Sequence, residues 1–225
     1  MYGLTTSQLF YSAGSLFFGN VPALYNVNLA QMFFYQASYP ILGKAYPLSH
    51  HQFSRTYFIQ GDLEDALSEA RAEVLLYPEN TETYYVIGLT LGYMNREKEA
   101  IEAFGTYLKG SPHSWAARND RAWLQFRIGD IDGAILTIAP VTHATDNAWV
   151  QNTYGTLLMN KKQYKDARVA FNNATNAVEK MTEKSWGKAY PGNDPRIYGT
   201  GLRAMKASIA ENLKLLDEKE KGARR

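Results

Sequence analysis

The feature that most constrains the fold of this chain is a repeated spacing of 34 residues. Ala66, Ala100 and Ala134 follow one another at that interval, and Ala167 comes 33 residues later. The residues around each alanine also recur, as GDLEDALSEA, NREKEAIEAF, GDIDGAILTI and KKQYKDARVAF. A fixed period in this range is typical of solenoid proteins, in which each repeat stacks on its neighbours. The period constrains the fold more than the function, because a repeat scaffold can present almost any surface.

Each period is predicted to contain two helices that pack closely together. In the copy at 81–114, apolar residues recur at helical spacing in two stretches, which are Tyr84, Ile87, Gly88 and Leu91, then Ala100, Phe104, Tyr107 and Leu108. The polar stretch Asn95–Glu99 carries the turn between them. Ser111-Pro112 ends the second helix, since the residue before proline is disfavoured in the α region. The small side chains of Gly88 and Ala100 allow the two helices to approach, and Phe104 fills the space beside them.

These positions closely resemble the motif of the tetratricopeptide repeat family. That motif has small residues at positions 8 and 20, a large or aromatic residue at 24 and proline at 32. The four copies have Ser54, Gly88, Ala122 and Gly155 at position 8; Ala66, Ala100, Ala134 and Ala167 at 20; Ala70, Phe104, Ile138 and Phe171 at 24; and Pro78, Pro112, Asp146 and Glu179 at 32. Asp146 and Glu179 depart from the motif, and the tryptophan of position 4 is replaced in every copy. The resemblance implies an all-α, right-handed α-solenoid of tetratricopeptide helix pairs.

The protein is predicted to divide into four parts. An aromatic, charge-poor helix pair occupies residues 1–46, four tetratricopeptide repeats follow at 47–80, 81–114, 115–147 and 148–181, a turn-rich loop spans 182–199, and a C-terminal capping helix with a charged tail covers 200–225. Within the last part, Leu202, Met205, Ile209, Leu213 and Leu216 form the apolar stripe of a helix over about 200–220. The loop is predicted from the turn-forming residues of Trp186–Pro195.

The N-terminal segment 1–43 contains no charged residue, although average usage predicts about ten. Two helices are expected there, over about 5–18 and 22–38, and Tyr39-Pro40 matches Tyr77-Pro78, which indicates a degenerate fifth helix pair. A simple transmembrane span is not expected, because serine, asparagine and glutamine residues interrupt the apolar runs. The expected role of this pair is to cover the first repeat. A membrane-proximal segment and a self-association surface are the alternatives.

No catalytic, metal or cofactor site is expected from the residues. A net charge of +2 gives no electrostatic reason for nucleic-acid binding, and the absence of cysteine excludes disulfides and thiolate chemistry. His50 and His51 are adjacent, so on a helix they point about 100° apart and do not share a metal readily. The acidic cluster Glu64, Asp65 and Glu69 is interpreted as complementing the dipole of a second helix near its start.

The family resemblance implies that the first helices of the repeats line a concave groove. The residues expected to bind a peptide in it, across the repeats, are Arg55, Tyr85, Leu89, Tyr93, Asn119, Trp123, Arg127, Trp149, Asn152 and Thr156. Asn119 and Asn152 would bond to a peptide backbone, because an amide both donates and accepts. The aromatic residues would supply contact area and Arg127 a charge contact, although packing between repeats is an equal alternative for Trp123 and Trp149. The lysine-and-asparagine clamp of chaperone-binding members of the family is absent.

The function expected from these features is a noncatalytic adaptor that binds a protein or peptide segment. The alternative is an accessory or regulatory subunit of an envelope-associated enzyme or assembly, tethered through the N-terminal region. On that view a membrane-associated partner contacts residues 1–43. An enzyme with an unrecognised site is the weakest class, because the sequence has no cluster of polar groups that indicates one. The sequence is compatible with a cytoplasmic and with a membrane-associated or envelope location.

Overall fold

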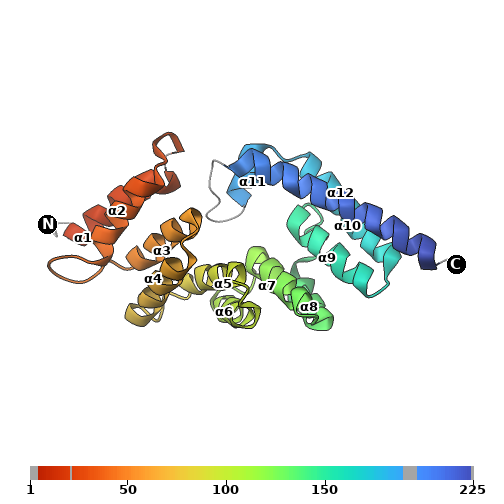
Figure 1. The fold of residues 1–225 in the computed structure, drawn as a ribbon, viewed down its shortest axis with the longest axis horizontal. Coiled ribbons are helices and arrows are strands. Elements are labelled where there is room, and N and C mark those ends of the chain that lie inside the picture. Colours follow the sequence, from red (N-terminus) through yellow and green to blue (C-terminus); the bar gives the residue numbers. More distant parts are fainter. Residues whose placement is uncertain (1–4, 21, 190–196, 224–225) are drawn as a thin grey trace. The chain divides into compact units, whose positions relative to one another are not determined.

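All regular secondary structure in the described part of the protein is helical. The computed structural model describes residues 5–20, 22–189 and 197–223. Its helices, shown in Figure 1, belong to two compact units, Met1–Gly110 and Ser111–Arg225. The all-α fold class expected from the sequence is confirmed.

The first unit consists of three successive helix pairs. They are α1 (Thr6–Ser15) with α2 (Val27–Ser38), α3 (Ser49–Gln60) with α4 (Leu63–Leu76), and α5 (Thr83–Tyr93) with α6 (Glu97–Gly110). The pairs also pack on one another, since α2 contacts α3 and α4 contacts α5. None of the described helices is both long enough and apolar enough to span a lipid bilayer.

The second unit contains two pairs followed by two further helices. The pairs are α7 (Trp115–Arg127) with α8 (Ile131–Ile138), and α9 (Ala148–Asn160) with α10 (Tyr164–Glu179). A short turn of 3-10 helix, η3 (Ala139–Val141), continues α8, and α11 (Glu183–Ala189) and α12 (Tyr198–Ala223) complete the unit. The repeat boundaries proposed from the sequence fall between these helix pairs.

The turn inside each of the four repeats contains one residue in the left-handed conformation. The φ values are 90° at Gly61, 57° at Asn95, 84° at Gly129 and 61° at Lys162. These residues keep the 34-residue spacing of the alanines, apart from the last interval, which is again 33. Glycine and asparagine adopt positive φ at low cost, so the sequence favours the end of the first helix at three of the four turns. Lys162 adopts it without that advantage.

The N-terminal pair has the same close approach of helices as two of the repeats. A Cβ atom on the small residue of the first helix would lie within 3 Å of the aromatic ring that faces it, and these contacts are Gly14 with Phe34 at 2.7 Å, Gly88 with Phe104 at 2.9 Å and Gly155 with Phe171 at 2.7 Å. The connection in the N-terminal pair is longer. It is formed by the wide turn η1 (Leu16–Asn20) and by η2 (Pro22–Leu24), so α2 begins at Val27, later than the sequence predicted.

The last helix covers the end of the second unit. The side chains of Leu202, Ile209 and Leu216 are buried, and Leu216 packs with Phe171 of α10. Arg168 of α10 donates hydrogen bonds to Asp217 at 2.6 Å and to Glu220 at 3.0 and 3.3 Å. The predicted helix over about 200–220 is therefore present and somewhat longer.

The predicted loop at 182–199 is corrected over residues 183–189, which form α11. Gly187, which indicated a turn, and Gly201 of α12 allow aromatic rings to pack between helices. A Cβ atom on Gly201 would lie 2.1 Å from the ring of Trp186, and one on Gly187 would lie 2.2 Å from the ring of Tyr198. The remainder of the predicted turn, residues 190–195, lies outside the described residues.

Candidate binding surface

The residues expected to bind a peptide all lie on the first helix of a pair, but they fall into two groups. Arg55 on α3 and Tyr85, Leu89 and Tyr93 on α5 belong to the first unit, and Asn119, Trp123 and Arg127 on α7 and Trp149, Asn152 and Thr156 on α9 belong to the second.

Of the two aromatic residues expected to bind a peptide in the first unit, Tyr93 is exposed and Tyr85 is buried. Tyr93 is 68% exposed, and its ring meets that of Phe58 edge-on at 5.2 Å. Tyr85 is only 7% exposed, because its ring packs 5.5 Å from Phe104 and 5.2 Å from Tyr107. The expectation that Tyr85 offers contact area to a peptide is thus corrected: it belongs to the interior between α5 and α6. Leu89 is half-buried.

In the second unit, three of the expected residues lie one turn apart along one face of α7. Trp123 is 43% exposed, with its ring 5.3 Å from that of Phe126, and Arg127 is exposed at the end of the helix. Asn119 is buried, and its Nδ2 lies 3.4 Å from Oδ1 of Asp120. Its own Oδ1 accepts no hydrogen bond from the described residues. We refer to Asn119, Trp123 and Arg127 as the α7 strip.

The expected residues of α9 are engaged inside the protein. Asn152 Oδ1 accepts a hydrogen bond of 2.9 Å from Nδ2 of Asn212 on α12, and the Thr156 hydroxyl donates to the Asn152 carbonyl at 3.0 Å. Thr156 is buried. The expectation that Asn152 and Thr156 line an open surface is therefore corrected, because the C-terminal helix supplies the partner of Asn152.

Trp149 on α9 is half-buried among other aromatic rings. Its ring lies 5.5 Å from that of Trp115 and 6.2 Å from that of Trp186. These contacts agree with the alternative considered for Trp149, which is packing between helices. Trp123 differs, because close to half of its side chain is exposed.

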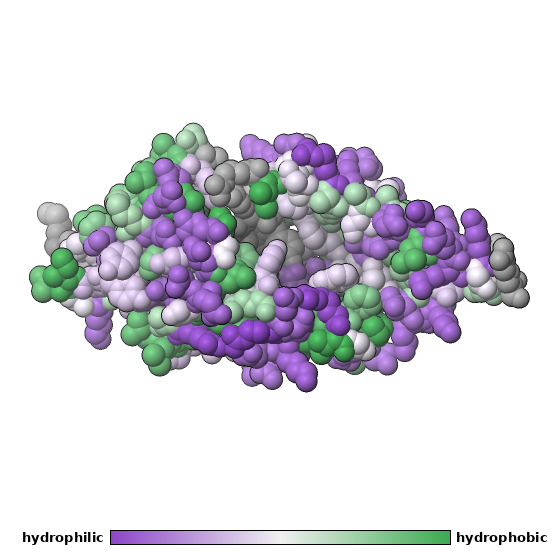
Figure 2. Space-filling model, in the orientation of Figure 1, coloured by the Kyte–Doolittle hydropathy of each residue, from purple (hydrophilic) through white to green (hydrophobic). Residues whose placement is uncertain are grey.

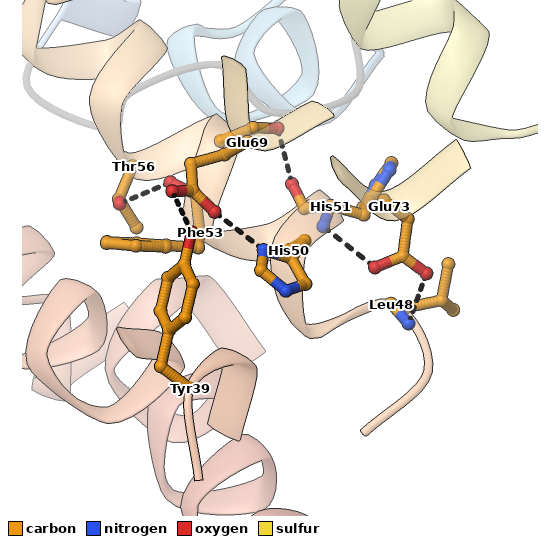
Figure 3. A network of polar contacts seen from close by, with 9 residues as sticks. Tyr39, Leu48, His50, His51, Phe53, Thr56, Glu69 and Glu73 are labelled. Carbon is orange, nitrogen blue, oxygen red and sulfur yellow. Dashed lines mark hydrogen bonds and ion pairs between the residues drawn. The ribbon is translucent and has the colours of Figure 1, made fainter. Parts of the chain in front are cut away.

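Sequence reasoning missed a buried polar network at the base of the N-terminal pair (Figure 3). Glu69 Oε1 accepts a hydrogen bond of 2.8 Å from the Tyr39 hydroxyl, and Oε2 lies 2.6 Å from Nδ1 of His50. Burial and the bond to Glu69 raise the pKa of Tyr39 above its usual value. Glu69 therefore pairs with the buried His50 of α3 and with the hydroxyl of Tyr39 after α2, which corrects its assignment to the helix dipole. The first turn of α4 does contain Glu64 and Asp65, as expected.

Glu73, one turn after Glu69, caps the start of α3 (Figure 3). Its Oε1 accepts hydrogen bonds of 2.7 Å from the Leu48 amide and from Nδ2 of Asn80, and its Oε2 accepts one of 3.3 Å from the His51 amide. Leu48 precedes α3 with φ of 67° and has no capping side chain, so a carboxylate from α4 satisfies the free N–H groups of that helix end. The sequence shows that Glu69 and Glu73 are four residues apart, and so lie on one face of a helix. It does not show what they bond to, because most of their partners are distant in sequence.

The buried acids Glu69 and Glu73 have structural partners. Among the described residues, no group of three or more histidine, cysteine, aspartate or glutamate side chains is placed to hold a metal ion.

Comparison with known proteins shows which fold the arrangement of the helices resembles. A family model described as tetratricopeptide repeat matches residues 81–112. No curated protein sequence matches this protein. The family match covers the second of the four predicted repeats, and the protein therefore contains a tetratricopeptide repeat.

Several solved structures have a similar fold at low sequence identity. A MamA structure described as the RS-1 ArsTM double mutant has a TM-score of 0.67 and 14% identity, and the match covers 78% of this chain and 96% of the MamA chain. MamA 41-end from Desulfovibrio magneticus RS-1 has a TM-score of 0.54 and 17% identity, covering 77% and 94%. YrrB, described as a TPR protein with an unusual peptide-binding site, has a TM-score of 0.61 and 16% identity, covering 76% and 86%. The protein thus has the fold of tetratricopeptide solenoids, a class of repeat scaffold.

Proposed function

We propose that this protein is a noncatalytic scaffold that binds a peptide or protein segment on the first helices of its repeats. The observation that carries the proposal is the exposed indole of Trp123 on the α7 strip. Tryptophan is enriched among the few residues that dominate binding energy at protein interfaces. Buried carboxylates are the usual sign of acid–base chemistry. Here Glu69 and Glu73 instead accept hydrogen bonds from side-chain and backbone groups of the fold.

The neighbours of Trp123 suit a polypeptide. Asn119 lies one turn before it, and its Oδ1 has no hydrogen-bond donor among the described residues. A buried acceptor without a donor costs about 1–3 kcal/mol, so a peptide N–H that meets this amide after a side-chain rotation would recover part of that cost. Arg127, one turn after Trp123, adds a charged donor at the exposed end of the strip.

The test is to capture partners with the full-length protein and then to measure their affinity for single variants. Trp123→Ala should weaken binding about thirtyfold or more, because loss of an interface anchor costs about 2 kcal/mol or more. Leu136→Ala is the matched control, since Leu136 is an exposed apolar residue of the same unit but lies on a second helix, α8. Circular dichroism confirms that the variants are folded. A folded Trp123→Ala protein with unchanged affinity would place the binding surface elsewhere.

A second candidate is an accessory subunit of an envelope-associated assembly, held through the N-terminal region. It is favoured by the exposure of Ile41 and Leu42, which are 96% and 85% exposed in the connection after α2. In the view of Figure 2, hydrophobic residues gather over the α1–α2 end, whereas mostly hydrophilic residues cover α12. Cell fractionation of wild type and of Ile41→Ser/Leu42→Ser distinguishes the candidates. The accessory-subunit function requires that the wild type sediment with membranes and that the double variant be released.

A further inference from the structure

Arg55 is a half-buried arginine of α3 that forms no ion pair with a carboxylate of the described residues. Its Nη1 donates a hydrogen bond of 2.7 Å to Oε1 of Gln52, and its Cζ lies 4.9 Å from the centre of the Phe18 ring. No described aspartate or glutamate forms an ion pair with it. Buried arginines are normally paired, because an uncompensated charge in a protein interior is costly.

The sequence explains why the segments that precede Arg55 and α3 itself supply no carboxylate. Residues 1–61 contain no aspartate or glutamate, so neither the N-terminal pair nor α3 can supply a carboxylate. The two buried acids of α4 that face α3 have other partners. Glu69 is bonded to His50 and Tyr39, and Glu73 binds the backbone at the start of α3. Within the described part of the protein, the guanidinium is therefore left with neutral neighbours.

The surroundings of Arg55 reduce its hydration without neutralising its charge. Burial lowers the pKa of Arg55 below its usual value, and the nearby Tyr11 and Tyr25 hydroxyls act in the opposite direction. Burial, and secondarily the charge of Arg55, lower the pKa of His51 to about 3, so this imidazole is neutral at pH 7. Arg55 stays protonated, because even a lowered arginine pKa lies far above neutrality. A positive charge without a carboxylate partner among the described residues thus remains at a half-buried position.

The wide turn η1 creates this arrangement. Gly19, with φ of 109°, lets the backbone bend after α1, and the neighbouring Phe18 ring lies over the guanidinium. The four repeats have a shorter connection at the same point, without an equivalent of this turn. The side chain of Arg55 nevertheless remains partly exposed, so an external group can reach it.

We propose that Arg55 binds a carboxylate of the polypeptide partner, supplied by an aspartate or glutamate side chain within an acidic segment. The inference rests on the proposed function, because it names the chemistry of the segment that the scaffold binds. A guanidinium presents two parallel N–H donors that match a carboxylate, and such charge-assisted hydrogen bonds strengthen where water is excluded. The terminal carboxylate of a polypeptide offers the same group, and a phosphate offers a similar one, so the experiment separates these sources.

The test is calorimetric titration of the full-length protein with four probes. They are a glutamate-rich peptide with both ends blocked, the same peptide with glutamine in place of glutamate, a neutral peptide with a free terminal carboxylate, and inorganic phosphate. The blocked glutamate peptide should bind at least tenfold more tightly than each of the others. Equal binding of the glutamine peptide overturns the proposal, as does tighter binding of the free terminal carboxylate or of phosphate, or no binding of the glutamate peptide.

Two variants assign the effect to the residue. Arg55→Gln should weaken binding of the glutamate peptide at least tenfold, because the ligand charge loses its partner. Arg71→Gln is the matched control, since Arg71 is an exposed arginine of the same unit on α4, and it should change the affinity less than twofold. An equal effect of the two variants overturns the proposal. If the acidic-segment proposal fails while Trp123→Ala still weakens partner binding, the scaffold function stands and the acidic chemistry does not.

A stability measurement separates binding from a purely structural role. Without ligand, Arg55→Met should have a Tm equal to or higher than that of the wild type, because it removes an uncompensated charge and keeps much of the side-chain volume. The glutamate peptide should raise the Tm of the wild type and leave that of Arg55→Met unchanged. A large fall in Tm for the ligand-free variant would show that Arg55 holds the fold together, and would overturn the proposal.

Discussion

At the scale of single residues, the contact between Gly88 and Phe104 determines how closely α5 and α6 approach. Because a Cβ atom at Gly88 would lie 2.9 Å from the ring, Gly88→Ala should destabilise the protein by about 1–3 kcal/mol through overpacking. Phe104→Leu alone should also be destabilising. The double variant should be more stable than the sum of the two single effects predicts, since the smaller side chain makes room for the methyl group. Chemical denaturation of the four proteins measures this coupling, and strictly additive effects would contradict the contact.

His51 makes stability depend on pH in a definite direction. Its Nδ1 lies 3.1 Å from the Thr83 hydroxyl, and burial and Arg55 hold its pKa at about 3, well below the usual 6.5. Between pH 6.5 and 3 the unfolded protein binds more protons at this position, so the contribution of His51 is complete above pH 6.5 and is lost as the pH falls. The expected loss is of order 1–2 kcal/mol by pH 5.

Urea denaturation at pH 7 and pH 5 checks this prediction. The difference between the two pH values should shrink in His51→Gln and persist in His113→Gln, because His113 is exposed. If both variants keep the dependence of the wild type, His51 is not its source.

At the scale of elements, the N-terminal pair acts as a cover for the first repeat. Phe34 and Ala30 of α2 pack against Phe53 of α3, which is almost fully buried. Deleting residues 1–43 should expose this surface and remove Tyr39 from Glu69, so the shortened protein should aggregate and lose thermal stability. Removing residues 221–225 is the control, because it leaves the buried leucines of α12 in place. Light scattering and thermal denaturation measure the outcome, and a monomeric truncation with unchanged Tm would contradict the cover.

The elements also show why some features could be predicted from the sequence and others could not. The helix pairs follow from a local signal, the spacing of Ala66, Ala100 and Ala134. The helix α11 does not, because Gly187 resembles a turn residue unless its ring partner, Tyr198, is known. A glycine favours a bend and a close approach equally well, and only the tertiary contact distinguishes them.

At the scale of the whole molecule, the sequence predicts the class of fold and only part of the candidate site. The period predicts which helix of each pair a residue occupies, and this was correct for every expected site residue. It does not predict exposure, which depends on distant partners. Tyr85 is covered by Tyr107, and Asn152 is bonded to Asn212, 60 residues further along the sequence. The α7 strip keeps an exposed tryptophan, and it is the part of the expected groove that the proposed function uses.

The aromatic residues are divided unevenly between the two units, and this has a spectroscopic consequence. The four tryptophans, Trp115, Trp123, Trp149 and Trp186, all belong to Ser111–Arg225, so fluorescence excited at tryptophan wavelengths reports on that unit alone. Far-ultraviolet ellipticity reports on the helices of both. Tryptophan emission therefore follows the unfolding of the second unit without any added probe. If Gly88→Ala, a change in the first unit, shifts the ellipticity transition and leaves the emission transition unchanged, the two units unfold separately.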